Sequence, residues 1–525
     1  MSEYEHTHEL TRRQLLVRGG AAALSLPLLA AACDSGGSDT DTITVEGTPK
    51  RGGTLRHGVL GGSSADTLDA GSPVAYPDFA RFSALYNGLA RLNATTLETE
   101  LVLAESIEPN TDASEWTIRL RDGIEFHNGK TLGVEDVVFT FDRIVTKQLF
   151  AALGLQGFDA KNTTKLDKRT VRIKLDAPSV VFGEQLANIN ATIVPVGYNP
   201  KQPVGTGPFM FESFTPGQES TFVRNPNYHV SGKPYLDSLV IVDIADDSAR
   251  LNALISGSID VADNIPPSQA SSISGTSGLG LVTSESVSWN PFTMRVDQAP
   301  FDDVRVRQAF RLIVDRPQMI ELARDGHGTV ANDMFSGNPP AGDPGFPQRH
   351  QDLDQAKALL KQAGKENLSV QLVTSDIASG VVAAAQVFAQ HAKGAGVTVD
   401  INKVNAGEFF GKNYTQWTFA QDFWFATGFL LQVTLSSLKS SPFNETHWND
   451  PEYVRLFNEA NRTPDPSKLY PLIHEMERID YDRGGYIIPY YNNILDAHSS
   501  KVGGLTPSRT GLPLHDYRYE ELWLT

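Results

Sequence analysis

The stretch from residue 368 to residue 401 constrains the fold of this chain more than any other. Residues 368–374 (Leu-Ser-Val-Gln-Leu-Val-Thr) have the composition of a strand. Residues 380–393 predict a helix that ends near Gly394, because glycine is favoured just beyond a helix. Residues 397–401 (Val-Thr-Val-Asp-Ile) predict a second strand. A strand, a helix and a strand in this order predict a βαβ unit with parallel strands and a right-handed crossover. With strands and helices mixed elsewhere, this indicates an α/β protein.

Three other segments give clear local predictions. Residues 116–120 alternate between apolar and polar side chains, as in a half-buried strand. Apolar residues at helical spacing between positions 134 and 144 predict an amphipathic helix. Residues 302–324 predict a longer helix with Ala309, Phe310 and Ile313 facing inward. We expect Pro317 to divide this helix, because proline interrupts a helix interior.

The length and the net charge of the chain limit the classes of protein to which it can belong. A chain of 525 residues exceeds what one core fills, so we expect two or three domains. The net charge of −17 argues against a nucleic-acid partner, because phosphate binding needs a basic surface. The chain has one cysteine and therefore no internal disulfide.

That one cysteine ends an N-terminal export signal. Arg12 and Arg13 precede an apolar run of small residues at 19–32, and Cys33 follows directly. Paired arginines are typical of the twin-arginine route, and a cysteine after small residues resembles the lipobox of bacterial lipoproteins. We therefore expect residues 1–32 to be a cleaved signal peptide, Cys33 to carry a lipid, and residues 33–50, which are small and polar, to form a flexible tether.

Two other interpretations of this N-terminus stay open. Cys33 would be a free thiol on a flexible arm, or the apolar run would be retained as a membrane anchor. The run has 14 residues, whereas a membrane span needs roughly 20, so cleavage is the favoured interpretation.

Six blocks carry a family resemblance. Residues 115–130 read Glu-Trp-Thr-Ile-Arg-Leu-Arg-Asp-Gly-Ile-Glu-Phe-His-Asn-Gly-Lys, and residues 204–209 read Val-Gly-Thr-Gly-Pro-Phe. The other blocks lie at 224–237, 252–262, 301–316 and 448–453. In this order they resemble the family 5 extracellular solute-binding proteins of ABC importers, which include dipeptide, oligopeptide and nickel-chelate binders. Most of these residues are expected to be scaffold, because glycine and proline in them suit tight turns.

The resemblance implies a fold and a function. The fold would be a two-lobed, class II periplasmic-binding-protein-like fold with an additional inserted domain. The implied bounds are 51–85, 195–285 and 500–525 for lobe I, 86–194 for the inserted domain, and 286–499 for lobe II. A small-molecule or peptide ligand would bind between lobes that close by a hinge. The chain would act as a monomer, without catalysis, and deliver its ligand to ABC permease and ATPase subunits.

The ligand site is expected near an aromatic segment. Residues 409–429 contain nine aromatic side chains, most of which we expect in a core. The resemblance places this segment at the cleft of lobe II, where rigid amphipathic walls are needed. Contact candidates within it are Trp424, Phe425 and Thr427. Candidates carried over by position are Ser63, Asp66, Tyr86, Asn87, Trp289, Asn290, Asn444, His447 and Trp448.

One departure from the family bears on the ligand. Peptide-binding relatives usually carry an acidic residue soon after this aromatic segment, which neutralises the amino terminus of the peptide. Residues 428–434 here read Gly-Phe-Leu-Leu-Gln-Val-Thr and contain no acid, and Asp422 is the nearest one. This favours a ligand without a free α-amine at that point, such as a blocked peptide, an oligosaccharide or another amphipathic molecule.

Motifs for other chemistry are missing from the sequence. It has no His-Glu-x-x-His, no cysteine cluster and no Gly-x-Ser-x-Gly elbow, so we expect neither a resident metal nor a cofactor. It has no Walker loop, so another chain must hydrolyse ATP. A nickel chelate stays open as a ligand, because it brings its own coordinating groups. Two rival functions also stay open: a surface hydrolase, and a peptide sensor or chaperone that imports nothing.

Overall fold

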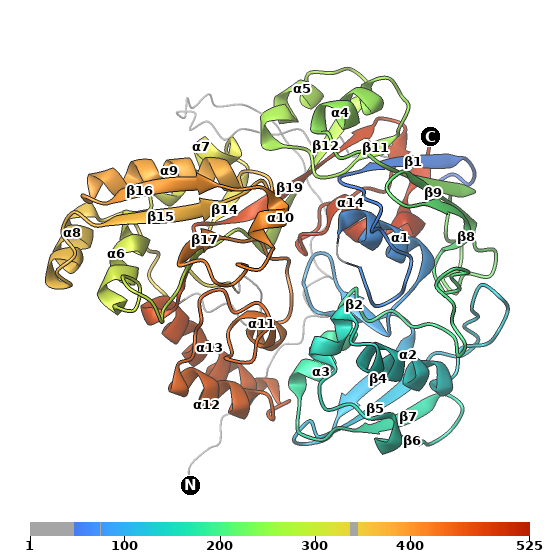
Figure 1. The fold of residues 1–525 in the computed structure, drawn as a ribbon. Helices are drawn as coiled ribbons and strands as arrows, with labels where there is room; N and C mark the ends of the chain where they lie inside the picture. Colours follow the sequence, from blue (N-terminus) through green and yellow to red (C-terminus); the bar gives the residue numbers. More distant parts are fainter. Residues whose placement is uncertain (1–46, 74, 336–344) are drawn as a thin grey trace, which may run out of the picture. The chain divides into compact units, whose positions relative to one another are not determined.

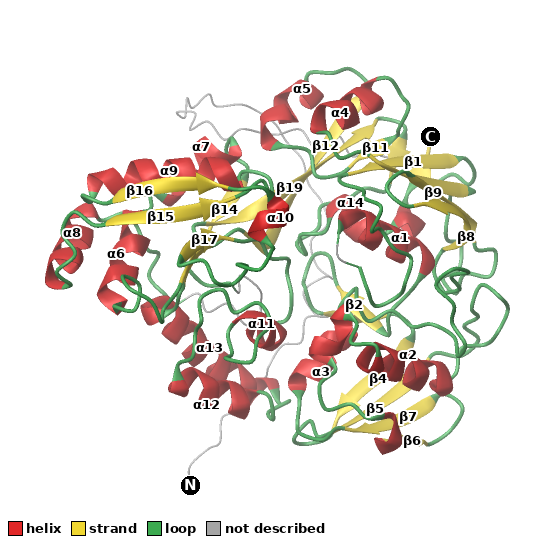
Figure 2. Ribbon diagram, viewed as in Figure 1, coloured by secondary structure: helices red, strands yellow, loops and turns green. Residues whose placement is uncertain are grey.

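The largest sheet of the protein has eight strands (Figure 1, Figure 2). The structure is a computed structural model that describes residues 47–73, 75–335 and 345–525. The strand order is β12–β19–β11–β1–β10–β9–β8, and β14 pairs with β19. The strands are β1 (Thr54–Val59), β8 (Phe209–Thr215), β9 (Glu219–Arg224), β10 (Ser238–Asp243), β11 (Val261–Ala262), β12 (Leu279–Trp289), β14 (Gly328–Val330) and β19 (Tyr490–Ser499).

Strand β1 lies in the middle of this sheet and pairs in parallel with β10 and β11. Parallel strands need both faces covered, and Leu55 and Val59 of β1 are fully buried. Helices α1 (Tyr76–Leu85) and α4 (Asp247–Ile255) pack against β1, and Phe82 of α1 lies in the same apolar core as Leu55. This core fixes the position of α1, whose end leads into the candidate site.

The five-stranded sheet contains the predicted βαβ unit. Strand β15 (Ser369–Thr374), helix α9 (Val381–Gly394) and strand β16 (Thr398–Lys403) follow one another, and the two strands are parallel with Ser369 opposite Thr398. The prediction from residues 368–401 is therefore confirmed. The sheet order is β16–β15–β17–β13–β18. The remaining strands are β13 (Phe292–Met294), β17 (Phe419–Gln421) and β18 (Tyr486–Ile487).

A four-stranded antiparallel sheet forms a third layer, in the order β4–β5–β7–β6. The strand predicted at 116–120 and the amphipathic helix predicted near 134–144 are both present there. Trp116 of β5 packs on Phe182 of α3 with ring centroids 5.8 Å apart. The elements are β4 (Ala104–Pro109), β5 (Glu115–Leu120), β6 (Thr163–Lys165), β7 (Thr170–Lys174), α2 (Val134–Thr146) and α3 (Val180–Leu186).

Proline does divide the helix predicted at 302–324. Helix α6 (Val304–Ile313) ends before Pro317, and helix α7 (Arg316–Arg324) begins with Pro317 in its first turn. A proline is tolerated there because the first helical amides have no partner within the helix. Asp315 caps α7 by accepting a hydrogen bond from the Gln318 amide at 3.0 Å.

The chain makes two short crossings between the eight-stranded and five-stranded sheets, besides the longer connections that lead into and out of β14. It leaves β12 at Trp289 and enters β13 at Phe292, and it leaves β18 at Ile487 and enters β19 at Tyr490. Each crossing is two residues long, and each contains a proline, Pro291 or Pro489. Short, restricted connections of this kind keep the ends of the two sheets close to one another.

The remaining elements surround these sheets. They are β2 (Ala90–Leu92), β3 (Thr99–Leu101), β20 (Val502–Gly503), β21 (Trp523–Leu524), α5 (Ala270–Ser274), α8 (Leu353–Gln362), α10 (Ala406–Phe409), α11 (Phe429–Ser436), α12 (Pro451–Ala460), α13 (Pro466–Arg483) and α14 (Pro513–Tyr517), with short 3₁₀ turns at Phe150–Gly154, Ala160–Asn162, Pro267–Gln269 and Tyr519–Glu521.

The predicted signal peptide at 1–32, Cys33 and the predicted tether up to residue 46 lie outside the described residues. Within the part of the chain that the structure describes, no helix combines the length and the apolar character that a membrane span requires.

The core of the five-stranded sheet yields a stability prediction. Phe419 is 1% exposed, and its ring contacts those of Phe292, Phe301, Phe310 and Phe388. We expect Phe419→Ala to lower the free energy of unfolding by about 3–5 kcal/mol, because it leaves a cavity that the sheet cannot close. Denaturant unfolding followed by near-ultraviolet circular dichroism measures this.

Phe410→Ala is the matched control, because that ring is 41% exposed. It should cost less than about 1 kcal/mol. Equal losses in the two variants would contradict the assignment of Phe419 to the core.

Candidate functional site

A cavity of about 580 Å³ lies among segments that are distant in sequence. Its walls come from residues 73–102, Phe150, residues 187–192, residues 410–443 and residues 510–520. A cavity of this size is typical of small-molecule sites, which run from about 300 to 1,000 Å³. A second void, of about 10 Å³, borders Trp289, Phe425 and Thr427.

One wall of the cavity is a belt of five aromatic rings. Phe423 contacts Phe410 at 6.3 Å between ring centroids, and Phe410 contacts Tyr414 at 5.1 Å. Tyr414 contacts Phe443 at 6.3 Å, and Phe443 contacts Trp424 at 6.0 Å. All five rings line the cavity. The wall is therefore rigid and largely apolar, which suits an apolar or cationic group of a ligand.

Trp289 holds Trp424 in place. The Trp289 amide donates to the Trp424 carbonyl at 3.0 Å, and the Trp424 amide donates to the Trp289 carbonyl at 2.9 Å. Their rings stack with centroids 5.8 Å apart. The Trp424 indole nitrogen is buried and has no hydrogen-bond partner among the described residues. It is a donor available to a ligand, since a buried N–H normally finds an acceptor.

Two buried carboxyl groups lie at the same wall. Asp422 lines the cavity and is 2% exposed, and Glu445 behind it is 4% exposed. The Tyr414 hydroxyl donates to Asp422 Oδ2 at 2.8 Å, and the Tyr486 hydroxyl donates to Glu445 Oε2 at 2.5 Å. Burial raises the pKa of Asp422, and burial together with the charge of Asp422 raises the pKa of Glu445 well above its ordinary value. The two groups cannot both be ionised cheaply in this position.

Another part of the cavity lining begins where α1 ends. The Tyr86 hydroxyl lies 2.7 Å from both the Leu68 carbonyl and the Tyr198 hydroxyl, so its polar atom is occupied within the protein. Burial raises the pKa of Tyr86 well above its ordinary value. The Asn87 amide oxygen accepts from Thr206 Oγ1 at 3.2 Å. The Tyr86 hydroxyl and the Asn87 amide oxygen are therefore already hydrogen-bonded within the protein.

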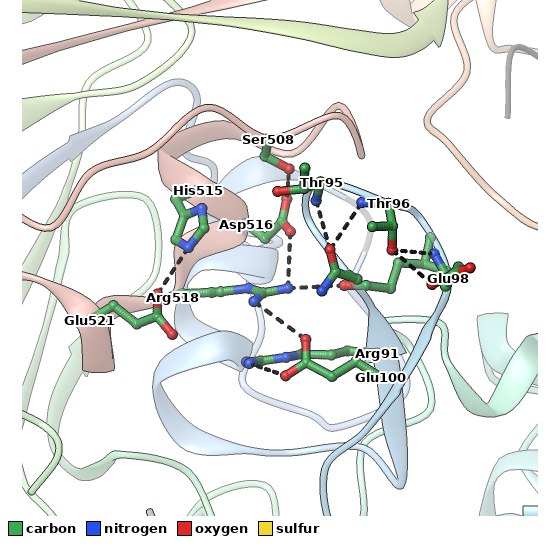
Figure 3. Close-up of polar contacts among 12 residues, drawn as sticks. Arg91, Thr95, Thr96, Glu98, Glu100, Ser508, His515, Asp516, Arg518 and Glu521 are labelled. Atoms are coloured by element: carbon green, nitrogen blue, oxygen red, sulfur yellow. Dashed lines mark hydrogen bonds and ion pairs between the residues drawn. The ribbon is translucent and has the colours of Figure 1, made fainter. Parts of the chain in front are cut away.

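A charged cluster forms the floor between β2, β3 and the C-terminal segment (Figure 3). Arg91 donates to Glu100 at 2.9 Å and to Glu520 at 3.2 Å. Arg518 lies 3.5 Å from Glu100 and 3.7 Å from Asp516, and it also donates to the Leu92 carbonyl at 2.9 Å. The two arginines are thus neutralised by carboxylates of the protein itself.

The backbone that carries part of this cluster is strained. Four consecutive residues, from Leu514 to Tyr517, have φ between 46° and 60°, which is the left-handed region. This conformation costs non-glycine residues roughly 1–2 kcal/mol each. Asp496 accepts from the Leu514 amide at 2.7 Å, and Asp516 accepts from Ser508 Oγ at 2.6 Å and from Thr510 Oγ1. Strain held by such contacts is common at ligand sites, and here it turns Asp516 and Tyr517 to the cavity.

Five of the twelve residues expected from the sequence line the cavity, and seven do not. Those that line it are Tyr86, Asn87, Trp424, Phe425 and Thr427. Those that do not are Ser63, Asp66, Trp289, Asn290, Asn444, His447 and Trp448. Trp289 supports Trp424 from behind, and with Phe425 and Thr427 it borders a smaller void beside the cavity.

The other six have partners in the protein or lie in its interior. Asp66 accepts from Arg81 at 3.0 Å and from the Ser63 amide at 2.9 Å. Asn290 accepts from Asn492 at 3.2 Å. Asn444 closes a turn by accepting from the Trp448 amide at 2.9 Å, and the ring of Trp448 is buried. Finally, His447 lies 3.2 Å from Asp297 and 3.0 Å from the Thr415 carbonyl.

The sequence patterns did not predict the charged cluster at the cavity or a segment rich in asparagine. Arg91, Asp516, Arg518 and Glu520 line the cavity, as do Asn188 and Asn190. The alternation of asparagine with apolar residues in Asn-Ile-Asn at 188–190 was the one local signal available. No local pattern could have brought Arg91 to Arg518, because the contact joins segments from opposite ends of the chain.

The described residues hold no group of three or more His, Cys, Asp and Glu side chains placed to bind a metal ion. The pair Asp422–Glu445 is buried, each carboxyl group accepts from a tyrosine hydroxyl, and Asp422 lines the cavity. What the geometry supports is non-covalent binding of an organic molecule against an aromatic wall.

Comparison with known proteins agrees with this architecture. Residues 98–432 match the model of the bacterial extracellular solute-binding proteins, family 5. The glutathione-binding protein GsiB of Escherichia coli (strain K12) is 27% identical over 477 residues, which cover 84% of this chain and 90% of that protein.

Solved structures share the two-lobed fold. The substrate-binding protein CtaP of Listeria monocytogenes has a TM-score of 0.79 at 22% identity, covering 91% of this chain and 100% of its own. The binding protein DppA of Helicobacter pylori, in complex with a peptide, has a TM-score of 0.77 at 21% identity, covering 90% of this chain and 98% of its own. The protein has the periplasmic-binding-protein-like fold expected from its sequence, and the chain belongs to the bacterial extracellular solute-binding proteins of family 5.

Proposed function

We propose that the cavity bounded by the aromatic belt is the site where this ABC-importer component captures its solute. The observation that carries the proposal is the cavity of about 580 Å³, with five aromatic rings on one wall and paired charges on its floor. The solute would be a small organic or peptide-like molecule with an apolar face. It would pass unchanged to a permease, with a separate ATPase subunit supplying energy. The chain would work as a monomer and catalyse no reaction.

The solutes of similar proteins indicate which classes of solute to expect. One binds glutathione, and others have been solved with a peptide, with agropinic acid and with a nickel–histidine complex. All are small organic molecules or chelates. The aromatic wall here favours an amphipathic member of this range.

Capture would work by closure of two lobes. We propose lobe I at 51–85, 195–285 and 500–525, an inserted domain at 86–194, and lobe II at 286–499, with the hinge at the two short crossings near Pro291 and Pro489. Contacts between the inserted domain and lobe II support a closed form. The Val180 amide donates to the Asn461 carbonyl at 2.8 Å, and Phe182 lies in one apolar core with Leu430.

A carboxylate also bridges these two parts. Glu184 of α3 accepts from the Leu431 amide at 2.7 Å, in the first turn of α11. Gly428 allows this approach, because a Cβ there would lie 2.4 Å from the Glu184 carboxyl carbon. Burial raises the pKa of Glu184 to about 7. The protonated form is therefore favoured in the closed protein below that pH.

We also propose that the protein is exported and held at the outer face of the cell membrane by a lipid on Cys33. The support is the sequence alone: paired arginines, an apolar run too short to span a membrane, and a cysteine after small residues. A tether at 33–50 would leave the lobes free to reach a permease.

The first prediction tests the cavity. Solute that co-purifies with the protein can be released by unfolding and identified by mass spectrometry. We expect Trp424→Ala to weaken its binding about 10- to 100-fold in calorimetry, because one aromatic contact is worth about 1.5–3 kcal/mol. Trp417→Ala is the matched control, since Trp417 lies in the same segment and does not line the cavity. Unchanged affinity in Trp424→Ala would refute the site.

The second prediction concerns Glu184 and pH. Since its pKa is raised from 4.5 to about 7 in the folded protein, its stabilising contribution is complete below pH 4.5 and is lost as pH rises through 7. Glu184→Gln keeps an acceptor for the Leu431 amide and removes the titration. The unfolding temperature of the variant minus that of the wild type should therefore increase from pH 5 to pH 8.

Glu108→Gln on an exposed strand position is the control and should give a difference that does not change with pH. If the difference in unfolding temperature between Glu184→Gln and the wild type also stays constant with pH, the raised pKa of Glu184 is contradicted.

The third prediction concerns the membrane. Cys33→Ser should move the protein from the membrane fraction to the soluble fraction of cells, because a diacylglycerol carries two acyl chains and two chains suffice for stable anchoring. Ser35→Ala, two residues away, should leave the distribution unchanged. A Cys33→Ser protein that stays with the membrane would contradict the lipid anchor.

A further inference from the structure

We propose that Glu184 of the inserted domain is a positioning residue for solute capture, which holds the start of α11 and the adjoining cavity wall when the protein closes. The proposal rests on the proposed function of the cavity and adds how closure is held and how it responds to pH. Helices α3 and α11 lie side by side (Figure 1), and they belong to different parts of the proposed division into domains. A contact between them would therefore form on closure and be broken on opening.

The start of α11 has no capping side chain of its own. Its N-cap residue is Gly428, whereas this position usually carries an oxygen that accepts from the second or third helical amide. Glu184 supplies that oxygen from α3. Its Oε2 accepts from the Leu431 amide at 2.7 Å, and the Leu430 amide also donates to the carboxyl group. The cap of α11 therefore comes from another domain.

The contact between the two domains is reciprocal. Asn461, which follows the last residue of α12 in lobe II, holds the start of α3. Its carbonyl accepts from the Val180 amide at 2.8 Å, and its side-chain oxygen accepts from the Val181 amide at 3.1 Å. Phe182 and Leu430 lie in one apolar core beside these bonds. Polar bonds in both directions around an apolar centre define one closed position.

The cavity wall leads directly into α11. Residues 423–427 all line the cavity, and α11 begins two residues later. The Thr427 hydroxyl donates to Gln432 Oε1 of α11 at 3.1 Å. A shift of the start of α11 would therefore move Thr427 and the rings before it. Glu184 is not among the residues that line the cavity, so it acts on the solute through this segment.

Uptake of a proton on closure follows from the burial of Glu184. Its side chain is partly buried, and burial raises its pKa from 4.5 to about 7. In an open form the carboxyl group would face water and return to its ordinary pKa. Closure near pH 6 would then take up about one proton from solvent, and the ratio of closed to open protein should rise about tenfold from pH 8 to pH 6.

No charged side chain accounts for the raised pKa of Glu184. Helix α11 and the 3₁₀ turn at Phe150–Gly154, both packed against α3, contain no charged residue. Strand β5, helix α2 and the end of α12 also contact α3. Their charged residues, none of which contributes to the shift, are Glu115, Arg119, Glu135, Asp136, Asp142, Arg143, Glu452, Arg455 and Glu459.

Distances between two spin labels on the full chain test the proposal without any solute. The labels are attached through Thr164→Cys on strand β6 of the inserted domain and Lys468→Cys on α13 of lobe II, both at exposed positions. A Cys33→Ser background leaves no other thiol. Pulsed double electron resonance at pH 5, 6, 7 and 8 gives the distance distribution. The population at short distance should increase as pH falls.

Substitutions at Glu184 separate positioning from simple packing. Glu184→Gln keeps an acceptor for the two amides and cannot ionise, so this variant should be as closed at pH 8 as the wild type is at pH 6. Glu184→Ala removes the acceptor and should favour the open form. Neither variant should respond to pH.

Two further variants serve as controls. Asn461→Ala loses the acceptor for the Val181 amide and no titratable group, so it should favour the open form at every pH and keep the dependence on pH. Glu108→Gln, at an exposed position of β4, should change neither the ratio nor its pH dependence.

Several outcomes would overturn the proposal. A wild-type distance distribution that is the same from pH 5 to pH 8 would do so, as would a pH dependence that persists in Glu184→Gln. If unfolding temperatures follow the prediction for Glu184→Gln while the distances do not change, Glu184 is buried within a unit that does not open, and the proposal is equally wrong. The proposed function survives these results if Trp424→Ala loses the co-purified solute, and it fails if that variant keeps full affinity, so the two failures are distinguishable.

Discussion

The backbone pairing of Trp289 with Trp424 is the constraint on which the candidate site depends. Trp289 ends β12 in the eight-stranded sheet, and Trp424 follows β17 of the five-stranded sheet, so two hydrogen bonds tie the edge of one sheet to the cavity wall next to the other. The buried ring of Trp289 also contacts Tyr486, which donates to Glu445. The aromatic belt and the carboxyl pair therefore depend on the same anchor.

The candidate site also contains features that lower the stability of the folded protein. The left-handed run from Leu514 to Tyr517 and the uncompensated pair Asp422–Glu445 both lie at the cavity, whereas the sheets follow ordinary patterns. Rules of local structure are broken most often where function requires it. Asp496 contacts the left-handed run through the Leu514 amide, and Arg518 contacts it through Asp516. The stability of the sheets offsets the unfavourable free energy of the strained backbone at the cavity wall.

Elements with a strong internal period could be predicted from the sequence, and the walls of the site could not. The unit β15–α9–β16 and the division of α6 from α7 at Pro317 are encoded within a few tens of residues. Arg91 meets Glu520 only because the C-terminal segment returns to β2. Trp424, which lines the cavity, was a candidate because it belongs to an aromatic segment. Asn444 and His447 lie close to that segment in sequence, yet their side chains close local turns and contacts away from the cavity.

The acid that is missing from residues 428–434 illustrates the limit of position-based reasoning. The first turn of α11 does meet a carboxylate, which is Glu184 from the distant helix α3, and Gly428 leaves room for it. This carboxyl group is engaged within the protein, and because burial raises its pKa to about 7, the neutral form is favoured below that pH. Asp422 lines the cavity, and it accepts from the Tyr414 hydroxyl and from the Phe423 amide, each at 2.8 Å. The fold, and not the position after the aromatic segment, therefore decides which buried carboxyl group reaches the cavity.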